Sequence, residues 1–283
     1  MAGPREPLTS PLNPKLKALR KLRRRRVREE SGMAAVEGVT LVLEALRAGL
    51  EVEAVYVTPR LAERPLGPAL LSELSHRGLK PVPVEDRVLA RLCDTETPQG
   101  VVAVVRVGRS LPESGAALDR MLNTGPGSRG LVLVVEGVQD PGNLGTLIRA
   151  ADAAGAGAVL LLPGTVDPWN PKAVRASMGS LFHLPVWECG PPAQVLPWLG
   201  QRGFLVVAGV PLGGTPVYRL DLTGPAAVVV GSEARGLSPE SLALSHRTAS
   251  VPVVGRAESL NVGLAAAVLL FEAVRQRLWV QGG

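Results

Sequence analysis

The chain has few of the residues that build metal centres and disulfides. Its 283 residues include two cysteines, Cys93 and Cys189, and three histidines, His76, His183 and His246, all far apart in sequence. Zinc sites need closely spaced ligands, and disulfide frameworks need several paired cysteines. We therefore expect no metal site and no histidine-based catalytic triad. Both thiols are expected to be buried side chains in a reducing cytoplasm.

Long apolar runs are also missing. The nearest approach is Leu264–Phe271, which is eight residues long and ends at Glu272, whereas a membrane-spanning helix needs about 18 apolar residues. The basic N-terminal region lacks the apolar segment of a secretory signal. These absences predict a cytoplasmic protein with no membrane partner. A transit peptide is the alternative for the Arg-rich start, although Glu6, Glu29 and Glu30 disfavour it.

Positive charge is concentrated at the start of the chain. Residues 1–30 hold ten Lys and Arg against three Glu, so their net charge of +7 exceeds the +6 of the whole chain. Leu12, Leu16, Leu19 and Leu22 recur at helical spacing and predict an amphipathic basic helix. Such a helix suits phosphate contacts, although a solvated face without a partner would carry the same charges. The candidate nucleic-acid contacts are Lys15, Lys17, Arg20, Lys21, Arg23 and Arg24.

Hydrophobic periodicity divides the chain into two α/β segments. Residues 31–107 alternate short helices and strands, with a helix predicted over Val36–Leu46. Gly, Pro and Ser interrupt residues 108–129, which we interpret as a linker. Residues 130–283 contain unalternating apolar runs typical of buried parallel strands, among them Leu131–Val135, Ala226–Val230 and Ser250–Val254. The sequence thus predicts a basic arm over residues 1–30 followed by two α/β domains.

Three segments of the second domain follow predicted strands with polar loops. They are Val135–Gly155, Val228–Glu240 and Val251–Ala267. In open α/β sheets, loops at the carboxyl ends of strands bind small ligands. These loops are therefore the candidate binding site.

The first loop leads into a helix with one apolar face. Asn143 is predicted to be its N-cap. Arg149 falls off the apolar face, so its guanidinium can reach over the loop. The alternative is a surface pair between Arg149 and Asp152 at i,i+3 spacing.

The second and third loops carry further polar groups. Glu233 lies between Gly231 and Gly236, either as a surface charge or held by a nearby arginine. In the third loop, Ser259 and Asn261 flank the start of the last helix, and either residue could cap it. No loop has the G-x-G-x-x-G pattern, which disfavours a dinucleotide-binding oxidoreductase.

Taken together, the three segments resemble the motifs of the SpoU or TrmH-type RNA ribose 2′-O-methyltransferases of the SPOUT superfamily. The motifs read N-x-G-x-x-x-R, G-x-E-x-x-G and P-x-x-G-x-x-x-S-L-N-V. The matching residues are Asn143, Gly145, Arg149, Gly231, Glu233, Gly236, Pro252, Gly255, Ser259, Leu260, Asn261 and Val262. A further family feature matches Arg175–Ser180, whereas Gly263 stands where many members carry serine.

The resemblance covers residues 131–278 and implies a parallel-sheet domain with a deep trefoil knot. It implies S-adenosylmethionine as the methyl donor. The first domain resembles the small substrate-binding domain, similar to ribosomal protein L30e, that often precedes the methyltransferase domain in this family. The implied cofactor-binding residues are Ala208, Gly209, Gly231, Gly236, Val251 and Leu260. The implied catalytic residues are Arg149, Asn143, Glu233, Ser259 and Asn261.

The resemblance also implies ribosomal RNA as the substrate and a homodimer as the assembly. Transfer RNA is the alternative substrate, and a non-catalytic RNA-binding protein of the same fold is the alternative function. The role of Arg149 has two interpretations. The family assigns it as a base, but arginine stays protonated in proteins, which favours holding the phosphate and stabilising the developing alkoxide.

Overall fold

The computed structural model describes residues 6–95, 97–108, 122 and 130–281. The predicted linker over residues 108–129 lies outside the described residues except for Gly108 and Leu122. The chain forms two compact units. The first combines residues 1–108 with Trp169–Phe182, and the second contains residues 109–168 and 183–283.

The first unit is built on a four-stranded sheet in the order β1-β4-β2-β3. β4 is antiparallel to β1 and β2, while β2 and β3 are parallel. The strands are β1 (Met33–Glu37), β2 (Val52–Val57), β3 (Val82–Pro83) and β4 (Val101–Arg106). The helices are α1 (Pro14–Lys21), α2 (Arg25–Ser31), α3 (Val39–Arg47), η1 (Pro59–Glu63), α4 (Gly67–His76), α5 (Asp86–Ala90), α8 (Pro171–Ala176) and α9 (Ser180–His183).

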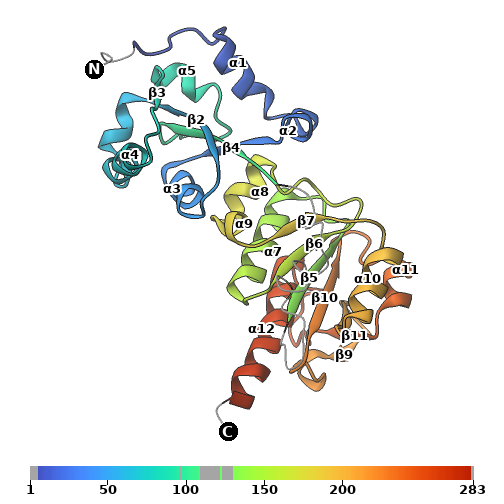
Figure 1. The fold of residues 1–283 in the computed structure, drawn as a ribbon. Coiled ribbons are helices and arrows are strands. Elements are labelled where there is room, and N and C mark those ends of the chain that lie inside the picture. Colours follow the sequence, from blue (N-terminus) through green and yellow to red (C-terminus); the bar gives the residue numbers. More distant parts are fainter. Residues whose placement is uncertain (1–5, 96, 109–121, 123–129, 282–283) are drawn as a thin grey trace. The chain divides into compact units, whose positions relative to one another are not determined.

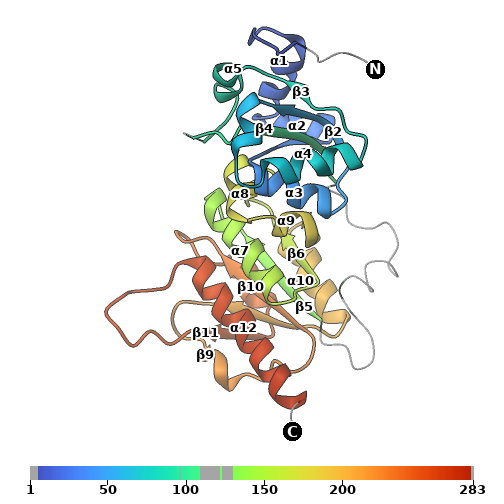
Figure 2. The same ribbon diagram turned by 90° about the vertical axis from the view of Figure 1, so that its left-hand side faces the viewer.

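The basic helix α1 belongs to the core of this unit. Leu16, Leu19 and Leu22 are buried and pack in one cluster with Val102 and Val104 of β4. Alternate residues of a strand point to opposite faces, so the intervening β4 residues face the side where α3 lies (Figures 1 and 2). The apolar stripe of α1 thus fixes one face of the helix and leaves the cationic face in solvent.

Two sequence predictions in this unit are wrong. The helix predicted over Val36–Leu46 begins only at Val39, because Val36 pairs with Ala103 in the β1–β4 ladder. Gly38, with φ of 100°, makes the turn between strand and helix. The basic run forms two helices, because Arg24 adopts an extended conformation before α2, and Leu12 is 69% exposed outside α1.

The second unit has a seven-stranded sheet in the order β7-β6-β5-β10-β8-β11-β9, and every pair is parallel. The strands are β5 (Leu131–Glu136), β6 (Ala158–Leu161), β7 (Val186–Glu188), β8 (Leu205–Gly209), β9 (Thr215–Pro216), β10 (Ala226–Gly231) and β11 (Arg247–Ser250). The helices are α7 (Pro141–Ala153), α10 (Pro192–Gln201), η2 (Val217–Arg219), α11 (Pro239–Leu244) and α12 (Val262–Gln281).

Helices cover both faces of this sheet (Figure 1). α10 packs with α11 and buries Leu196 and Leu199 against β5, β6 and β8, while α7 packs with α12 on the opposite face. Strands buried on both faces read as continuous apolar runs, which is why β5 and β10 are recognisable in the sequence. The predicted α/β class and parallel sheet are confirmed. The trefoil knot stays a prediction.

One strand of the second unit differs from the prediction. β11 covers Arg247–Ser250, not Ser250–Val254. Its neighbour β8 ends at Gly209, which pairs with Ala249, so the chain beyond Ser250 has little strand left to pair with. Pro252 also lacks the N–H that a ladder needs. Residues 251–254 are consequently a loop.

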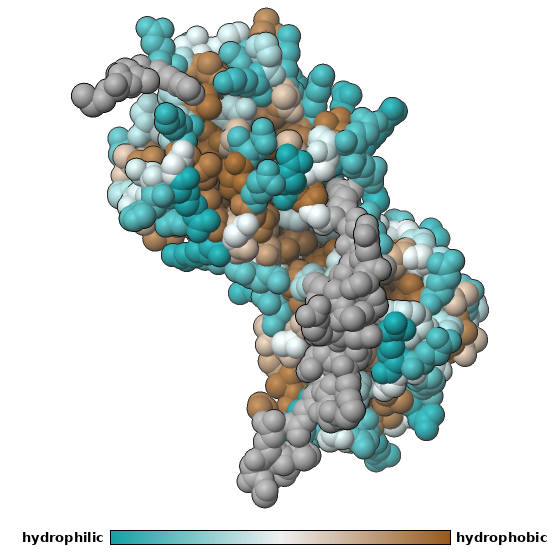
Figure 3. All heavy atoms as spheres, viewed as in Figure 1, coloured by the Kyte–Doolittle hydropathy of each residue, from teal (hydrophilic) through white to brown (hydrophobic). Residues whose placement is uncertain are grey.

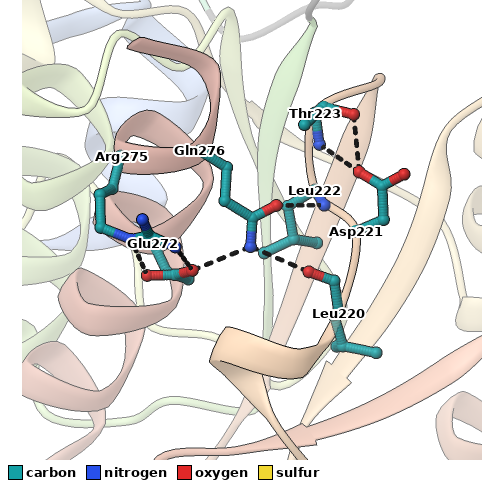
Figure 4. Close-up of polar contacts among 7 residues, drawn as sticks. All are labelled: Leu220, Asp221, Leu222, Thr223, Glu272, Arg275 and Gln276. Carbon is teal, nitrogen blue, oxygen red and sulfur yellow. Dashed lines mark hydrogen bonds and ion pairs between the residues drawn. The ribbon is translucent and has the colours of Figure 1, made fainter. Parts of the chain in front are cut away.

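The last helix is tied to the segment that precedes β10 (Figure 4). The Gln276 side chain donates to the carbonyl of Leu220 at 2.9 Å and accepts from the N–H of Leu222 at 2.8 Å. Gln276 also donates to Glu272 at 2.8 Å. Hydrogen bonding from Arg275 lowers the pKa of Glu272, so this carboxylate remains ionised at neutral pH.

Replacing Gln276 with leucine should lower the free energy of unfolding by about 1–3 kcal/mol, because two backbone groups are left without a partner. Urea unfolding followed by circular dichroism measures the change. Arg275→Gln is the control, since an exposed ion pair contributes at most about 1 kcal/mol. Equal destabilisation by the two variants would contradict the assigned role of Gln276.

Within the described parts of the chain, no helix has the length and apolar character needed to cross a bilayer.

Candidate functional site

A cavity of about 680 Å³ opens in the second unit beside the carboxyl ends of its central strands. The loops that follow β8, β10 and β11 form its walls, and the start of α12 closes it. Five of the six predicted cofactor-binding residues line this cavity: Gly209, Gly231, Gly236, Val251 and Leu260. The predicted site is therefore a concave space, as a ligand site requires.

The loop after β10 folds back tightly on itself. The Gly236 N–H donates to the carbonyl of Ser232 at 2.8 Å, and Gly236 has φ of 66°. A Cβ on Gly231 would lie 2.5 Å from the Leu237 nitrogen. The return of the loop therefore requires glycine at position 231 even before any ligand approaches.

Three polar side chains from separate segments meet in one hydrogen-bonded chain. The Asn143 amide donates to Glu233, and the Asn261 amide donates to Asn143 Oδ1 at 3.1 Å. Asn261 Oδ1 accepts from the Gly263 N–H at 2.9 Å, so Asn261 also caps α12. Glu233 and Asn261 line the cavity. The network places one carboxylate and two amides beside the same cavity. Glu233 and Asn261 are 90 and 118 residues from Asn143 in the sequence.

The predicted helix cap in the first loop is wrong. Asp140 is the N-cap of α7, and its carboxylate accepts from the Asn143 N–H at 2.9 Å. Asn143 lies inside the first helical turn, which frees its amide for Glu233. Among the described residues, no ion pair joins Glu233 to Arg235, so the Asn143 amide, and not an arginine, holds this carboxylate.

Three predicted residues do not line the cavity: Arg149, Ala208 and Asn143, the last of which contacts the lining residues Glu233 and Asn261. Arg149 is exposed on α7, and no ion pair with Asp152 is present in the described parts of the chain. Ala208 is fully buried in the core cluster that includes Leu199, one residue before the lining begins at Gly209. Ser259, predicted beside Asn261, does line the cavity.

Sequence reasoning missed parts of the site. Glu136 ends β5, and its carboxylate accepts from the Ser238 N–H at 3.2 Å, which anchors the loop after β10. The position of Glu136 directly after the apolar run Leu131–Val135 could have marked it as a site residue. Val210–Leu212, the loop after β8, also lines the cavity. It carries no polar side chain, and no sequence signal marked it.

Both thiols lie outside this site. Burial raises the pKa of Cys93 to about 12 and that of Cys189 to about 11, so both stay protonated near neutral pH. Among the described residues, no cluster of His, Cys, Asp and Glu could hold a metal ion.

The cavity combines apolar walls with a polar rim. Val251, Leu260 and Leu269 offer aliphatic surfaces suited to a planar ring, and loop backbone supplies amide and carbonyl groups. The amides and carboxylate of the network supply directional hydrogen bonds. Fold and site together define a parallel α/β protein with a small-molecule site at the carboxyl edge of its sheet.

Comparison with known families agrees with this description. Residues 130–271 match the SpoU rRNA Methylase family, and residues 13–103 match the MRM3-like substrate binding domain. The chain belongs to the SpoU rRNA methylase family and is an RNA methyltransferase of that family.

Relatives resemble the chain over nearly its whole length. The 23S rRNA (guanosine(2553)-2′-O)-methyltransferase RlmP of Bacillus subtilis is 34% identical, over 93% of this chain and 97% of its own. A solved RNA 2′-O ribose methyltransferase is 34% identical with a TM-score of 0.81, covering 96% of this chain and 100% of its own. An AdoMet-bound rRNA methyltransferase from Sinorhizobium meliloti is 30% identical with a TM-score of 0.80, covering 95% of this chain and 97% of its own.

Proposed function

We propose that the protein transfers the methyl group of S-adenosylmethionine to a ribose 2′-hydroxyl of ribosomal RNA. The observation that carries this proposal is the cavity at the ends of β8, β10 and β11, rimmed by the chain of Asn143, Glu233 and Asn261. Relatives include an AdoMet-bound rRNA methyltransferase and 23S rRNA 2′-O-methyltransferases. The names of these relatives support S-adenosylmethionine as the cofactor and ribosomal RNA as the substrate.

The cavity fits such a cofactor by its chemistry. Val251 and Leu260 would hold the adenine ring, while Gly209, Gly231 and Gly236 would let the loop backbone approach it. When bound, the sulfonium supplies an electrophilic methyl group. The chain itself must position the ribose hydroxyl and stabilise the charge that develops on its oxygen.

Arg149 is proposed to do that work from α7. Its exposed guanidinium can bind the adjacent phosphate and stabilise an alkoxide. Asn143, held by Glu233 and Asn261, would orient the ribose, and Ser259 would complete the polar rim.

Incubation with radiolabelled S-adenosylmethionine tests the proposal, with unmodified 23S rRNA and bulk tRNA as separate substrates. We expect label in 23S rRNA, within dinucleotides that resist alkaline cleavage because the 2′-hydroxyl is blocked. Label only in tRNA would favour the alternative substrate. Binding of cofactor and RNA without transfer would favour a non-catalytic RNA-binding protein.

The cationic face of the first unit is proposed to bind the RNA. Arg23 pairs with Asp94, whereas the other exposed cations from α1 to Arg24 have no ion pair among the described residues. The exposed unpaired set is Lys15, Lys17, Arg20, Lys21 and Arg24. Arg23, although predicted to bind RNA, already has a carboxylate partner.

Changing these five residues to glutamine should weaken RNA binding and flatten its salt dependence. Removing one phosphate-binding cation lowers the slope of log affinity against log salt by about 0.7–0.9. Filter binding at several salt concentrations measures the slope. Arg25→Gln with Arg26→Gln is the matched control, because Glu29 and Glu30 already pair with these arginines. An unchanged slope in the five-residue variant would remove this face from the RNA interface.

A homodimer through α12 is the proposed assembly. Large apolar side chains of this helix are exposed: Leu264, Val268, Phe271 and Leu278. Hydrophobic atoms are visible near the grey C-terminal residues in Figure 3, where Figure 1 places this helix. Phe271→Asp should convert the dimer to a monomer in sedimentation equilibrium. Leu12→Asp is the control in the first unit, and a wild-type monomer would contradict the assembly.

A further inference from the structure

A second, smaller cavity lies entirely within the first unit. Its volume is about 100 Å³, and it lies beside Thr58, which follows β2, and Gly100, which precedes β4. Arg60 and Arg64 from the region of η1 line it, together with Asp86 at the start of α5. Nothing in the cofactor site or on the cationic face of α1 uses this cavity.

Thr58 gives the cavity an unsatisfied polar group. The residue is 4% exposed, and its buried hydroxyl has no hydrogen-bond partner among the described residues. Its backbone N–H donates to the Gly100 carbonyl at 2.9 Å, so the side chain is held at the cavity. A buried hydroxyl without a partner is costly and uncommon in folded proteins. An oxygen of a bound ligand would supply the missing acceptor.

The charges around the cavity favour an anion. The guanidinium groups of Arg60 and Arg64 line the cavity with one carboxylate, that of Asp86, and among the described residues each guanidinium makes only one long contact. Arg60 Nε lies 3.7 Å from Asp86, and the Arg64 guanidinium donates to the Pro98 carbonyl at 3.4 Å. Each guanidinium has five N–H groups, so most remain available. A cavity of this volume has room for a tetrahedral oxyanion.

Gly100 keeps the space beside the hydroxyl open. It has φ of 81°, and a Cβ at this position would lie 2.6 Å from Thr58 Oγ1. Any larger residue would therefore press on the group that needs a partner.

We propose that this cavity binds one backbone phosphate of the RNA substrate, with Arg60 and Arg64 as the charged contacts and Thr58 as the hydroxyl donor. The proposal rests on the proposed function only in naming RNA as the source of the phosphate. It adds a contact separate from the cationic face of α1 and insensitive to base identity, since phosphate contacts position the RNA without reading sequence.

Binding of the full chain to a 23S rRNA transcript tests the proposal at several salt concentrations. Arg64→Gln should weaken affinity about threefold to tenfold and lower the salt slope by about 0.7–0.9, the change expected when one phosphate is no longer neutralised. Asp86→Asn should tighten binding, because it removes the opposing charge. Thr58→Val should weaken binding without lowering the melting temperature, because the isosteric change removes an unpaired hydroxyl. Arg77→Gln, whose guanidinium pairs with Glu73 on α4, is the control and should change neither affinity nor slope.

Competition with inorganic phosphate tests whether the cavity binds a phosphate of the RNA backbone or a free phosphate ion. It should compete with RNA for the wild-type chain and lose this effect in Arg64→Gln. Wild-type affinity and slope in both Arg64→Gln and Thr58→Val would overturn the proposal. Loss of phosphate binding with unchanged RNA binding would also overturn it, in favour of a free-anion site. A wild-type chain that binds RNA but transfers no methyl group would refute the proposed function alone.

Discussion

Arg149→Ala is expected to reduce methyl transfer at least about 100-fold, the size of effect typical when one charge-stabilising donor is removed. The affinity for S-adenosylmethionine should change less than about twofold, because Arg149 does not line the cavity. Stability should also be retained, since the side chain is exposed and has no ion pair among the described residues. Single-turnover transfer and calorimetric cofactor binding measure the two quantities on the same preparation. Full turnover by the variant would remove Arg149 from the mechanism.

Arg149→Lys distinguishes the two roles of the residue. If the side chain acts as a base, lysine should move the rising limb of the pH–rate profile to lower pH, because an ammonium loses its proton more readily than a guanidinium. If it binds phosphate and stabilises the alkoxide, lysine should retain part of the rate with an unshifted profile. We expect the second result, because arginine stays protonated in proteins.

Gly231→Ala is expected to weaken cofactor binding by about 10- to 100-fold, because the loop after β10 must move at a cost of about 1–3 kcal/mol for overpacking. The added Cβ would meet the backbone of Gly236 and lie 2.5 Å from the Leu237 nitrogen, and neither atom belongs to a flexible side chain. That movement also displaces Glu233 from Asn143, so transfer by cofactor-saturated enzyme should fall as well.

Gly255→Ala is the matched control for this change. Gly255 belongs to the third motif, yet a Cβ at this position would have no atom within 4 Å. Calorimetry with S-adenosylmethionine compares the two variants, and thermal melting checks that both are folded. Wild-type affinity in Gly231→Ala would show that the loop return is not needed for binding.

The sequence was sufficient for the parts of the fold that rest on local pattern. β5 and β10 are unbroken apolar runs, and the residues that follow β10 and β11 line the cavity as predicted. Strands set by distant partners could not be identified in the same way. β1 contains two alanines, and its local pattern favours a helix. It is a strand because it pairs with β4. β9 has two residues and exists through its pairing with β11.

Three of the predicted polar residues lie together, but the contacts among them were not predicted. Asn143, Glu233 and Asn261 were identified, yet the cap of α7 proved to be Asp140. A sequence of Asp-Pro-Gly-Asn offers two capping residues, and propensity alone does not choose between them. The structure makes the choice by giving the Asn143 amide a partner 90 residues away.

The position of the cavity-lining residues along the chain has a consequence for biosynthesis. The residues that line the larger cavity run from Gly209 to Leu269, and α12, which closes it, begins only at Val262. The whole first unit is therefore synthesised before any wall of this cavity exists. The cavity lining is complete only once residues 262–269 have been synthesised, so a fragment ending before residue 262 is expected to bind no cofactor.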